Sequence, residues 1–116
     1  MSPKEIAENA YKFLDEKKAV DIKVIDISKV SVIADYFIIC GANNARMVKS
    51  LADNVEQKLG AMKVAPRSVE GYETAKWILM DYNDVIIHIF NQEERLFYDL
   101  ERIWSDGKVV EEFNDK

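Results

Sequence analysis

The sequence predicts an α/β protein in which a mixed sheet of four to five strands packs with three helices. Two observations support this class: apolar residues recur at helical spacing in three segments, and short apolar runs typical of strands lie between them. The resulting element order, helix, two strands, helix, short strand, hairpin and helix, is that of a mixed α/β sandwich. A chain of 116 residues with 48% hydrophobic and 32% charged residues is expected to form a single domain over residues 1–116.

The first and last helices each begin at a recognisable cap. Ser2, Pro3 and Glu5 form the pattern of a capping box, so a helix is expected to start here and to end within residues 15–19. The last helix is predicted over residues 91–104. The tail after residue 107 is acidic and offers few apolar side chains for docking, namely Val109, Val110 and Phe113.

The second helix, residues 43–60, is the clearest of the three. Asn43 or Asn44 is suited to cap its start, and Gly60 is suited to end it. Its apolar residues recur at helical spacing and are predicted to be buried: Met47, Val48, Leu51, Ala52, Val55 and Leu59.

The strands are predicted from apolar runs and turn residues. Residues 21–28 have apolar side chains on both faces, and residues 35–41 are almost wholly apolar, which is typical of a central strand. A short strand is expected before a turn at Gly71. Residues 76–81 and 84–90 predict a hairpin in which Asn83 supplies the positive φ of a tight turn.

The net charge of −5 is unevenly distributed, with −1 in residues 1–43, +2 in residues 44–76 and −6 in residues 77–116. This balance argues against a dominant direct nucleic-acid interaction and favours a basic partner. No segment approaches the roughly 18 apolar residues of a membrane span. The N-terminus lacks the pattern of a signal peptide, and the single cysteine, Cys40, is typical of a reducing compartment, so a cytoplasmic location is expected.

Catalytic and metal-binding chemistry finds little support in the residue pattern. The only histidine, His88, lies in one strand with Asp84, four residues away, which separates their Cα atoms by roughly 13 Å. Ordinary structural zinc sites need four cysteine or histidine ligands, and the chain has two such residues. We therefore predict no catalytic residues, no metal site and no cofactor, and we interpret His88 as a packed or partner-facing side chain.

The element order also resembles the nucleotidyltransferase fold, but without its catalytic motif. Those enzymes need Gly-Ser at a helix start and Asp-x-Asp on a following strand. Here Gly41 is followed by Ala42, and the chain contains no Asp-x-Asp.

Aromatic and acidic residues cluster around the predicted hairpin. Trp77, Leu79 and Asp81 share one face of their strand, and large aromatics on an exposed face are typical of protein interfaces. The alternative is that Trp77 belongs to the core and the acids are solvated turn residues.

Nearly the whole chain resembles the ribosomal silencing factor family, also called the Iojap family. The resemblance is carried by DYFIICGANNARMVKSLADNV and by EGYETAKWILMDYNDVIIHIFNQEERLFYDLERIW. Gly41-Ala42 departs from the family's usual Thr-Gly or Ser-Gly, and Asn83 stands where the family usually has glycine.

The resemblance implies a translation repressor, not an enzyme, with the fold of a nucleotidyltransferase. Such a factor is expected to bind the large ribosomal subunit through its L-fourteen protein, to block joining with the small subunit when nutrients are short, and to form homodimers. The partner-binding surface is predicted to comprise Tyr72, Glu73, Trp77, Leu79, Asp81 and Tyr82, with Trp77 and Tyr82 as apolar anchors and Glu73 and Asp81 facing basic side chains. A role in large-subunit assembly and a degenerate nucleotidyltransferase are the alternatives.

Overall fold

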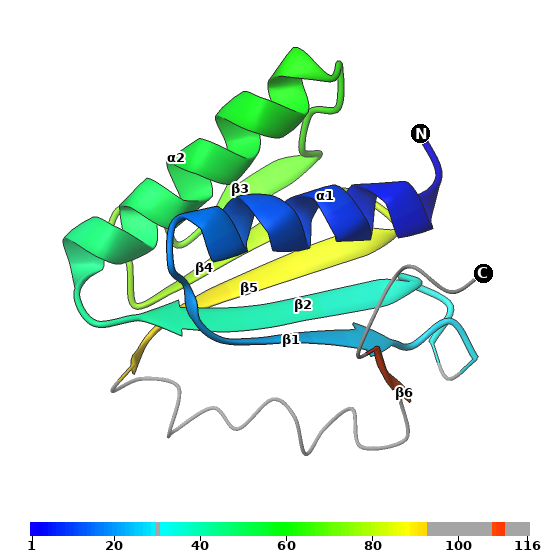
Figure 1. The fold of residues 1–116 in the computed structure, drawn as a ribbon, viewed down its shortest axis with the longest axis horizontal. Coiled ribbons are helices and arrows are strands. Elements are labelled where there is room, and N and C mark those ends of the chain that lie inside the picture. Colours follow the sequence, from blue (N-terminus) through cyan, green and yellow to red (C-terminus); the bar gives the residue numbers. More distant parts are fainter. Residues whose placement is uncertain (30, 93–107, 111–116) are drawn as a thin grey trace.

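The computed structural model describes residues 1–29, 31–92 and 108–110. Both helices of the described part lie on one face of a mixed sheet, so that the molecule has a layer of helices above a layer of strands (Figure 1). No described helix is long and apolar enough to cross a membrane.

Helix α1 spans Pro3–Glu16 and begins as its sequence predicts. The Ser2 hydroxyl accepts a hydrogen bond from the Glu5 backbone N–H at 3.1 Å, and the Glu5 carboxylate accepts one from the Ser2 backbone N–H at 2.9 Å. Two donors of the first turn, which have no partner inside the helix, are thereby satisfied. The predicted capping box is confirmed.

Helix α2 spans Ala45–Ala61 and is capped by Asn44, whose side chain accepts a hydrogen bond from the Met47 backbone N–H at 2.9 Å. The helix continues one residue beyond the predicted end at Gly60. The prediction that Met47 is buried is wrong, because this side chain lies in the first turn and is 36% exposed. The other five predicted residues of the stripe are buried.

The sheet contains six strands in the order β3-β4-β5-β2-β1-β6. Their bounds are β1 Val20–Asp26, β2 Tyr36–Ala42, β3 Ser68–Glu70, β4 Trp77–Asp81, β5 Val85–Asn91 and β6 Lys108–Val110. The central pair, β2 and β5, is parallel, and the other pairs are antiparallel. The sheet is therefore mixed, as predicted.

The predicted count of four to five strands is too low by the short edge strand β6. Residues 109 and 110 pair with residues 25 and 24 of β1, so the apolar pair in the acidic tail extends the sheet. Asn91 is the last residue of β5, and the rest of the predicted third helix, from residue 93 on, lies outside the described residues. The likeness to nucleotidyltransferases stays a prediction.

The buried side chains form one cluster on each face of the sheet. The larger cluster joins α1 and α2 to the face that carries Val24, Ile38 and Ile78. The smaller cluster lies on the opposite face and contains Ile25, Ile27, Ala34, Phe37, Ile39 and Phe90. Neighbouring residues Val24 and Ile25 belong to different clusters, which confirms that this strand is covered on both faces.

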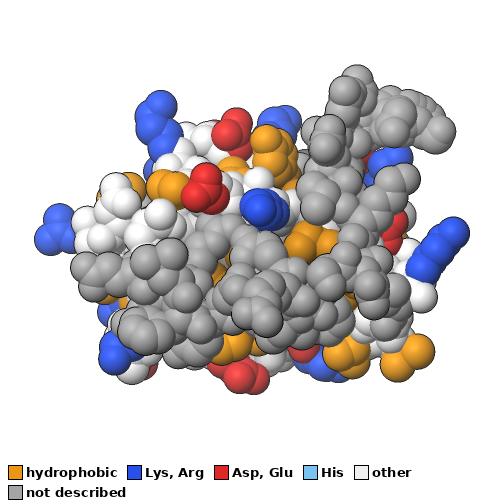
Figure 2. Space-filling model, turned by 90° about the horizontal axis from the view of Figure 1, so that it is seen from below, with side chains coloured by type: hydrophobic (Ala, Val, Ile, Leu, Met, Phe, Trp, Pro, Cys, Tyr) orange, Lys and Arg blue, Asp and Glu red, His pale blue; other side chains and the backbone are white. Residues whose placement is uncertain are grey.

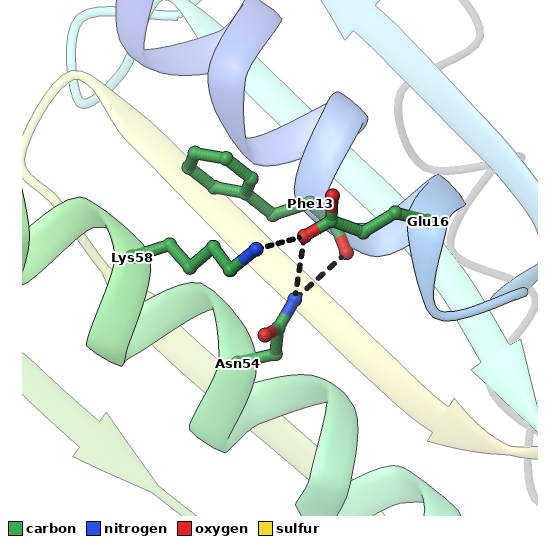
Figure 3. A network of polar contacts seen from close by, with 4 residues as sticks. All are labelled: Phe13, Glu16, Asn54 and Lys58. Carbon is green, nitrogen blue, oxygen red and sulfur yellow. Dashed lines mark hydrogen bonds and ion pairs between the residues drawn. The ribbon is translucent and has the colours of Figure 1, made fainter.

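A polar network ties the end of α1 to the middle of α2 (Figure 3). The Asn54 amide donates to the Phe13 carbonyl oxygen at 3.1 Å and to the Glu16 carboxylate at 3.3 Å, and Lys58 donates to the same carboxylate at 2.8 Å. Asn54 is 8% exposed, so its amide is a buried polar group with partners. The network satisfies a carbonyl of the last helical turn and locks the two helices together.

Candidate docking surface

Strand β4 presents different side chains to the two faces of the sheet. Ile78 and Met80 are fully buried under the helices, whereas Trp77 and Leu79 alternate with them and remain partly exposed. The opposite face of β4 is therefore the part of the predicted surface that solvent reaches. Seen from this side, the described residues present hydrophobic, basic and acidic side chains (Figure 2).

Trp77 is held in place by an aromatic cluster on that face. Its ring stacks on Phe90, with 5.1 Å between centroids, and its indole N–H donates to Nδ1 of His88 at 3.1 Å. The His88 ring in turn lies 4.6 Å from the ring of Phe37. Rings from β2, β4 and β5 thus fix the orientation of Trp77, which keeps an apolar and partly exposed side chain in one conformation.

His88 is a packed histidine, as predicted, and not an exposed acid or base. It is 3% exposed, and burial lowers its pKa to about 4. Because Nδ1 accepts the Trp77 hydrogen bond, the neutral ring carries its proton on Nε2, which is buried without a partner among the described residues. The ring positions Trp77 and stays neutral at pH 7.

Asp81 does not present a free carboxylate to a partner, contrary to the prediction. Its Oδ2 accepts a hydrogen bond from the Arg67 guanidinium at 2.8 Å, and its Oδ1 accepts one from the Asn83 backbone N–H at 2.8 Å. The carboxylate is thus bound to the hairpin turn and to Arg67, the residue before β3, and residue 81 is 9% exposed. Asn83 has a φ of 72°, as its place in the turn predicts.

Tyr82 is not an exposed anchor either, so this prediction is also wrong. Its side chain is 3% exposed and belongs to the core cluster under the helices. Burial raises the pKa of its hydroxyl. The residue follows β4 directly, and the turn directs its ring inward.

Tyr72 lies on the helix side of the sheet, so the predicted surface is split in two. The Tyr72 hydroxyl donates to both carboxylate oxygens of Asp53 on α2, each at 3.1 Å, and the Lys49 ammonium lies 5.3 Å from its ring centroid. Glu73 is exposed next to it. Trp77 and Leu79 lie together, whereas Tyr72 packs against the cluster on the other face.

The possibility of chemistry at Asp81, Asp84 and His88 is not supported by their positions. Across residues 1–29, 31–92 and 108–110, no three acidic, histidine or cysteine side chains form a group that could hold a metal ion. Asp84 is exposed in the turn and His88 is buried in the sheet. Sequence reasoning also missed Arg67, whose role follows from the pairing of Ser68 with Asp81 across β3 and β4.

Comparison with known proteins places the chain in a family of ribosome-associated translation regulators. The family model described as ribosomal silencing factor during starvation matches residues 1–116. The chain is 35% identical to ribosomal silencing factor RsfS of Halalkalibacterium halodurans, over 96% of this chain and 95% of the relative. It is 33% identical to RsfS of Bacillus subtilis, over 96% and 94%. The chloroplastic Iojap protein of Zea mays is 26% identical, with 43% of its length covered.

Solved structures have the same fold. A crystal structure of a protein from Chromobacterium violaceum superposes with a TM-score of 0.88 at 31% identity, covering 100% of this chain and 95% of that one. A second, from Bacillus halodurans, gives 0.83 at 31% identity, with 93% and 98% covered. The chain belongs to the ribosomal silencing factor family, which confirms the resemblance found in its sequence.

Proposed function

We propose that this protein binds the large ribosomal subunit through its L-fourteen protein and prevents the small subunit from joining, which slows translation when nutrients are limiting. The supporting observation is a family match over residues 1–116 in a chain whose β4 strand offers Trp77 and Leu79 on the face away from the helices. The protein acts by occupying a surface, without turnover, as one domain in the cytoplasm.

The docking surface of this proposal is centred on Trp77 and Leu79. A large aromatic side chain, held rigidly by neighbouring rings, loses little conformational entropy on binding and is typical of interface hot spots. Glu73 is an exposed carboxylate suited to meet lysine or arginine at the rim. Tyr72 lies on the helix face and anchors the loop that carries Glu73 through its hydrogen bonds to Asp53, while Asp81 and Tyr82 support the hairpin from inside.

The test is co-sedimentation of the purified protein with isolated large subunits, followed by addition of small subunits. The expected result is binding to free large subunits and fewer joined ribosomes. Binding without any loss of joining would instead indicate an assembly factor. No binding to the large subunit would overturn the proposal.

Two variants locate the surface. Leu79→Ala and Glu73→Lys are expected to weaken binding to the isolated L-fourteen protein by about tenfold or more, the size of an interface contact worth over 1 kcal/mol. Lys63→Gln, exposed at a distance from β4 along the chain, serves as the control. Unchanged binding in both folded variants would place the interface elsewhere.

We also propose that the free protein forms a homodimer, as the family resemblance implies. Sedimentation equilibrium of the pure protein is expected to give twice the mass of 13.4 kDa. A monomer at all micromolar concentrations would contradict this part.

A further inference from the structure

A basic hollow lies on the helix side of the molecule, away from Trp77 and Leu79. It is an open pocket of about 660 Å³ between the end of α1, residues 45–57 of α2 and Tyr72 in the loop after β3. Its lining contains three cationic side chains, Lys17, Arg46 and Lys49, and one acidic side chain, Asp53. We refer to it as the α2 hollow. It concentrates positive charge on a chain whose net charge is −5.

The single carboxylate of the α2 hollow is already engaged. Asp53 accepts hydrogen bonds from the Tyr72 hydroxyl on both oxygens, and this bond raises the pKa of Tyr72. Glu56 and Glu73 lie near enough to Tyr72 to raise its pKa further, but neither lines the hollow. Glu16, next to Lys17 in the chain, is paired with Lys58 (Figure 3). The side chains that line the hollow therefore carry three positive charges against one negative charge.

One of the cations, Arg46, lies where a helix disfavours positive charge. Arg46 is the second residue of α2 and Lys49 follows one turn later, whereas the first turn of α2 contains no acidic residue. The N-terminal end of a helix carries a positive partial charge, which repels the Arg46 guanidinium in the first turn. The first turn of α1 shows the ordinary pattern, with Glu5 at this place. An anion bound in the α2 hollow would relieve this repulsion.

The groups that line the hollow favour the phosphates of a nucleic-acid backbone over a nucleotide with a stacked base. One face of the Tyr72 ring is taken by Lys49 and its hydroxyl by Asp53, so the ring has little free surface on which a base could stack. Hydroxyl and amide groups of Ser50 and Gln57 continue the lining along α2. Guanidinium, ammonium and amide donors in a row are the groups that contact phosphate backbones.

We infer that the α2 hollow binds backbone phosphates of large-subunit ribosomal RNA beside the protein partner. The inference rests on the proposed function for its location but concerns a separate face of the molecule. The net charge of −5 argues against RNA as the main source of affinity, whereas a local contact with few phosphates would orient the bound protein.

The experiment compares the double variant Arg46→Gln, Lys49→Gln with the control Lys29→Gln, Lys63→Gln, which removes the same charge outside the hollow. Affinity for purified large subunits is measured between 50 and 300 mM KCl (roughly the range in which phosphate contacts weaken). Loss of two phosphate contacts is expected to reduce the slope of log affinity against log salt by about 1.4 to 1.8. The control is expected to keep the native slope.

Two further measurements decide whether the cations of the α2 hollow contact RNA or protein. Binding to the isolated L-fourteen protein is expected to be the same for the native protein and the double variant. If the double variant loses this binding, the cations contact protein and the inference is wrong. A native salt slope in the double variant would also overturn it.

Protein-free large-subunit ribosomal RNA serves as the last probe and separates this inference from the proposed function. The native protein and the control are expected to bind it weakly, and the double variant at least fivefold more weakly. If the native protein bound this RNA but not the intact subunit, the proposed function would be wrong, whereas the inference that the α2 hollow binds phosphates would remain. Equal binding of all three proteins to the RNA would overturn the inference.

Discussion

The two faces of the sheet are made by the same strands but differ in what they bury. Under the helices the sheet carries aliphatic side chains that are fully excluded from water, such as Ile38, Ile78 and Ile87. The opposite face adds rings to its aliphatic side chains, among them Phe37, Phe90 and the buried His88, and it leaves Trp77 and Leu79 partly exposed. The first face holds the larger buried cluster, whereas the second holds Trp77 by stacking at the surface where we propose that the partner docks.

The sharpest test of this difference is a pair of substitutions at neighbouring residues of β4. Ile78→Ala removes a side chain that is fully buried and is expected to lower the free energy of unfolding by about 2–5 kcal/mol. Leu79→Ala, on the partly exposed face, is expected to cost less than half of that while weakening large-subunit binding. Urea denaturation measures the first effect and co-sedimentation the second. Equal loss of stability in both variants would erase the distinction between the faces.

The pH dependence of stability tests the role of His88, the buried polar ring on the face away from the helices. The pKa of His88 is lowered from 6.5 to about 4 by burial, so between these pH values the unfolded chain binds a proton that the folded chain does not. The stability contribution of the neutral ring is complete above pH 6.5 and is lost as the pH falls, by about 3 kcal/mol at pH 4.

The variant His88→Gln isolates this effect, because the chain contains no other histidine. Its free energy of unfolding, measured from pH 7 to pH 4, is expected to fall less steeply than that of the native protein. If the two proteins lost stability equally as the pH falls, the pKa of His88 would be the same in the folded and unfolded states, and the prediction would be wrong.

A substitution at Gly71 tests the conformation of the loop that leads into β4. Its φ is 80°, and a Cβ here would clash with the carbonyl oxygen of Trp77. Gly71→Ala is expected to destabilise the protein by about 2 kcal/mol and to disturb Trp77 fluorescence. Gly60→Ala is the control, because no atom lies within 4 Å of the added group in α2, and it is expected to stabilise by about 0.5–1 kcal/mol. A neutral Gly71→Ala would contradict the strained geometry.

The smallest expected effect lies in the polar network between α1 and α2. Asn54→Ala leaves the Phe13 carbonyl without its side-chain donor and is expected to cost about 1–2 kcal/mol in thermal or urea unfolding. Gln57→Ala, exposed on the same helix, is expected to change stability by about 0.5 kcal/mol at most. Similar losses in the two variants would mean that the network adds nothing beyond helix propensity.

Local signals in the sequence were sufficient for most of the elements. The capping box at Ser2, the cap at Asn44 and the positive φ at Asn83 are decided by neighbours within three residues, so they could be predicted. The family resemblance was likewise readable from residues in the chain alone and is confirmed. The strand β6 could not be predicted, because three residues form a strand here only by pairing with β1.

The site depended on contacts between distant segments. Alternation along β4 correctly grouped Trp77 with Leu79, since side chains alternate in any strand. It could not show that Arg67 would engage Asp81 or that Tyr82 would turn into the core, because burial and pairing depend on what packs against a residue. For the same reason, the net charge of the sequence did not indicate the α2 hollow. A net charge sums all residues, whereas only the fold brings Lys17 beside Arg46 and Lys49.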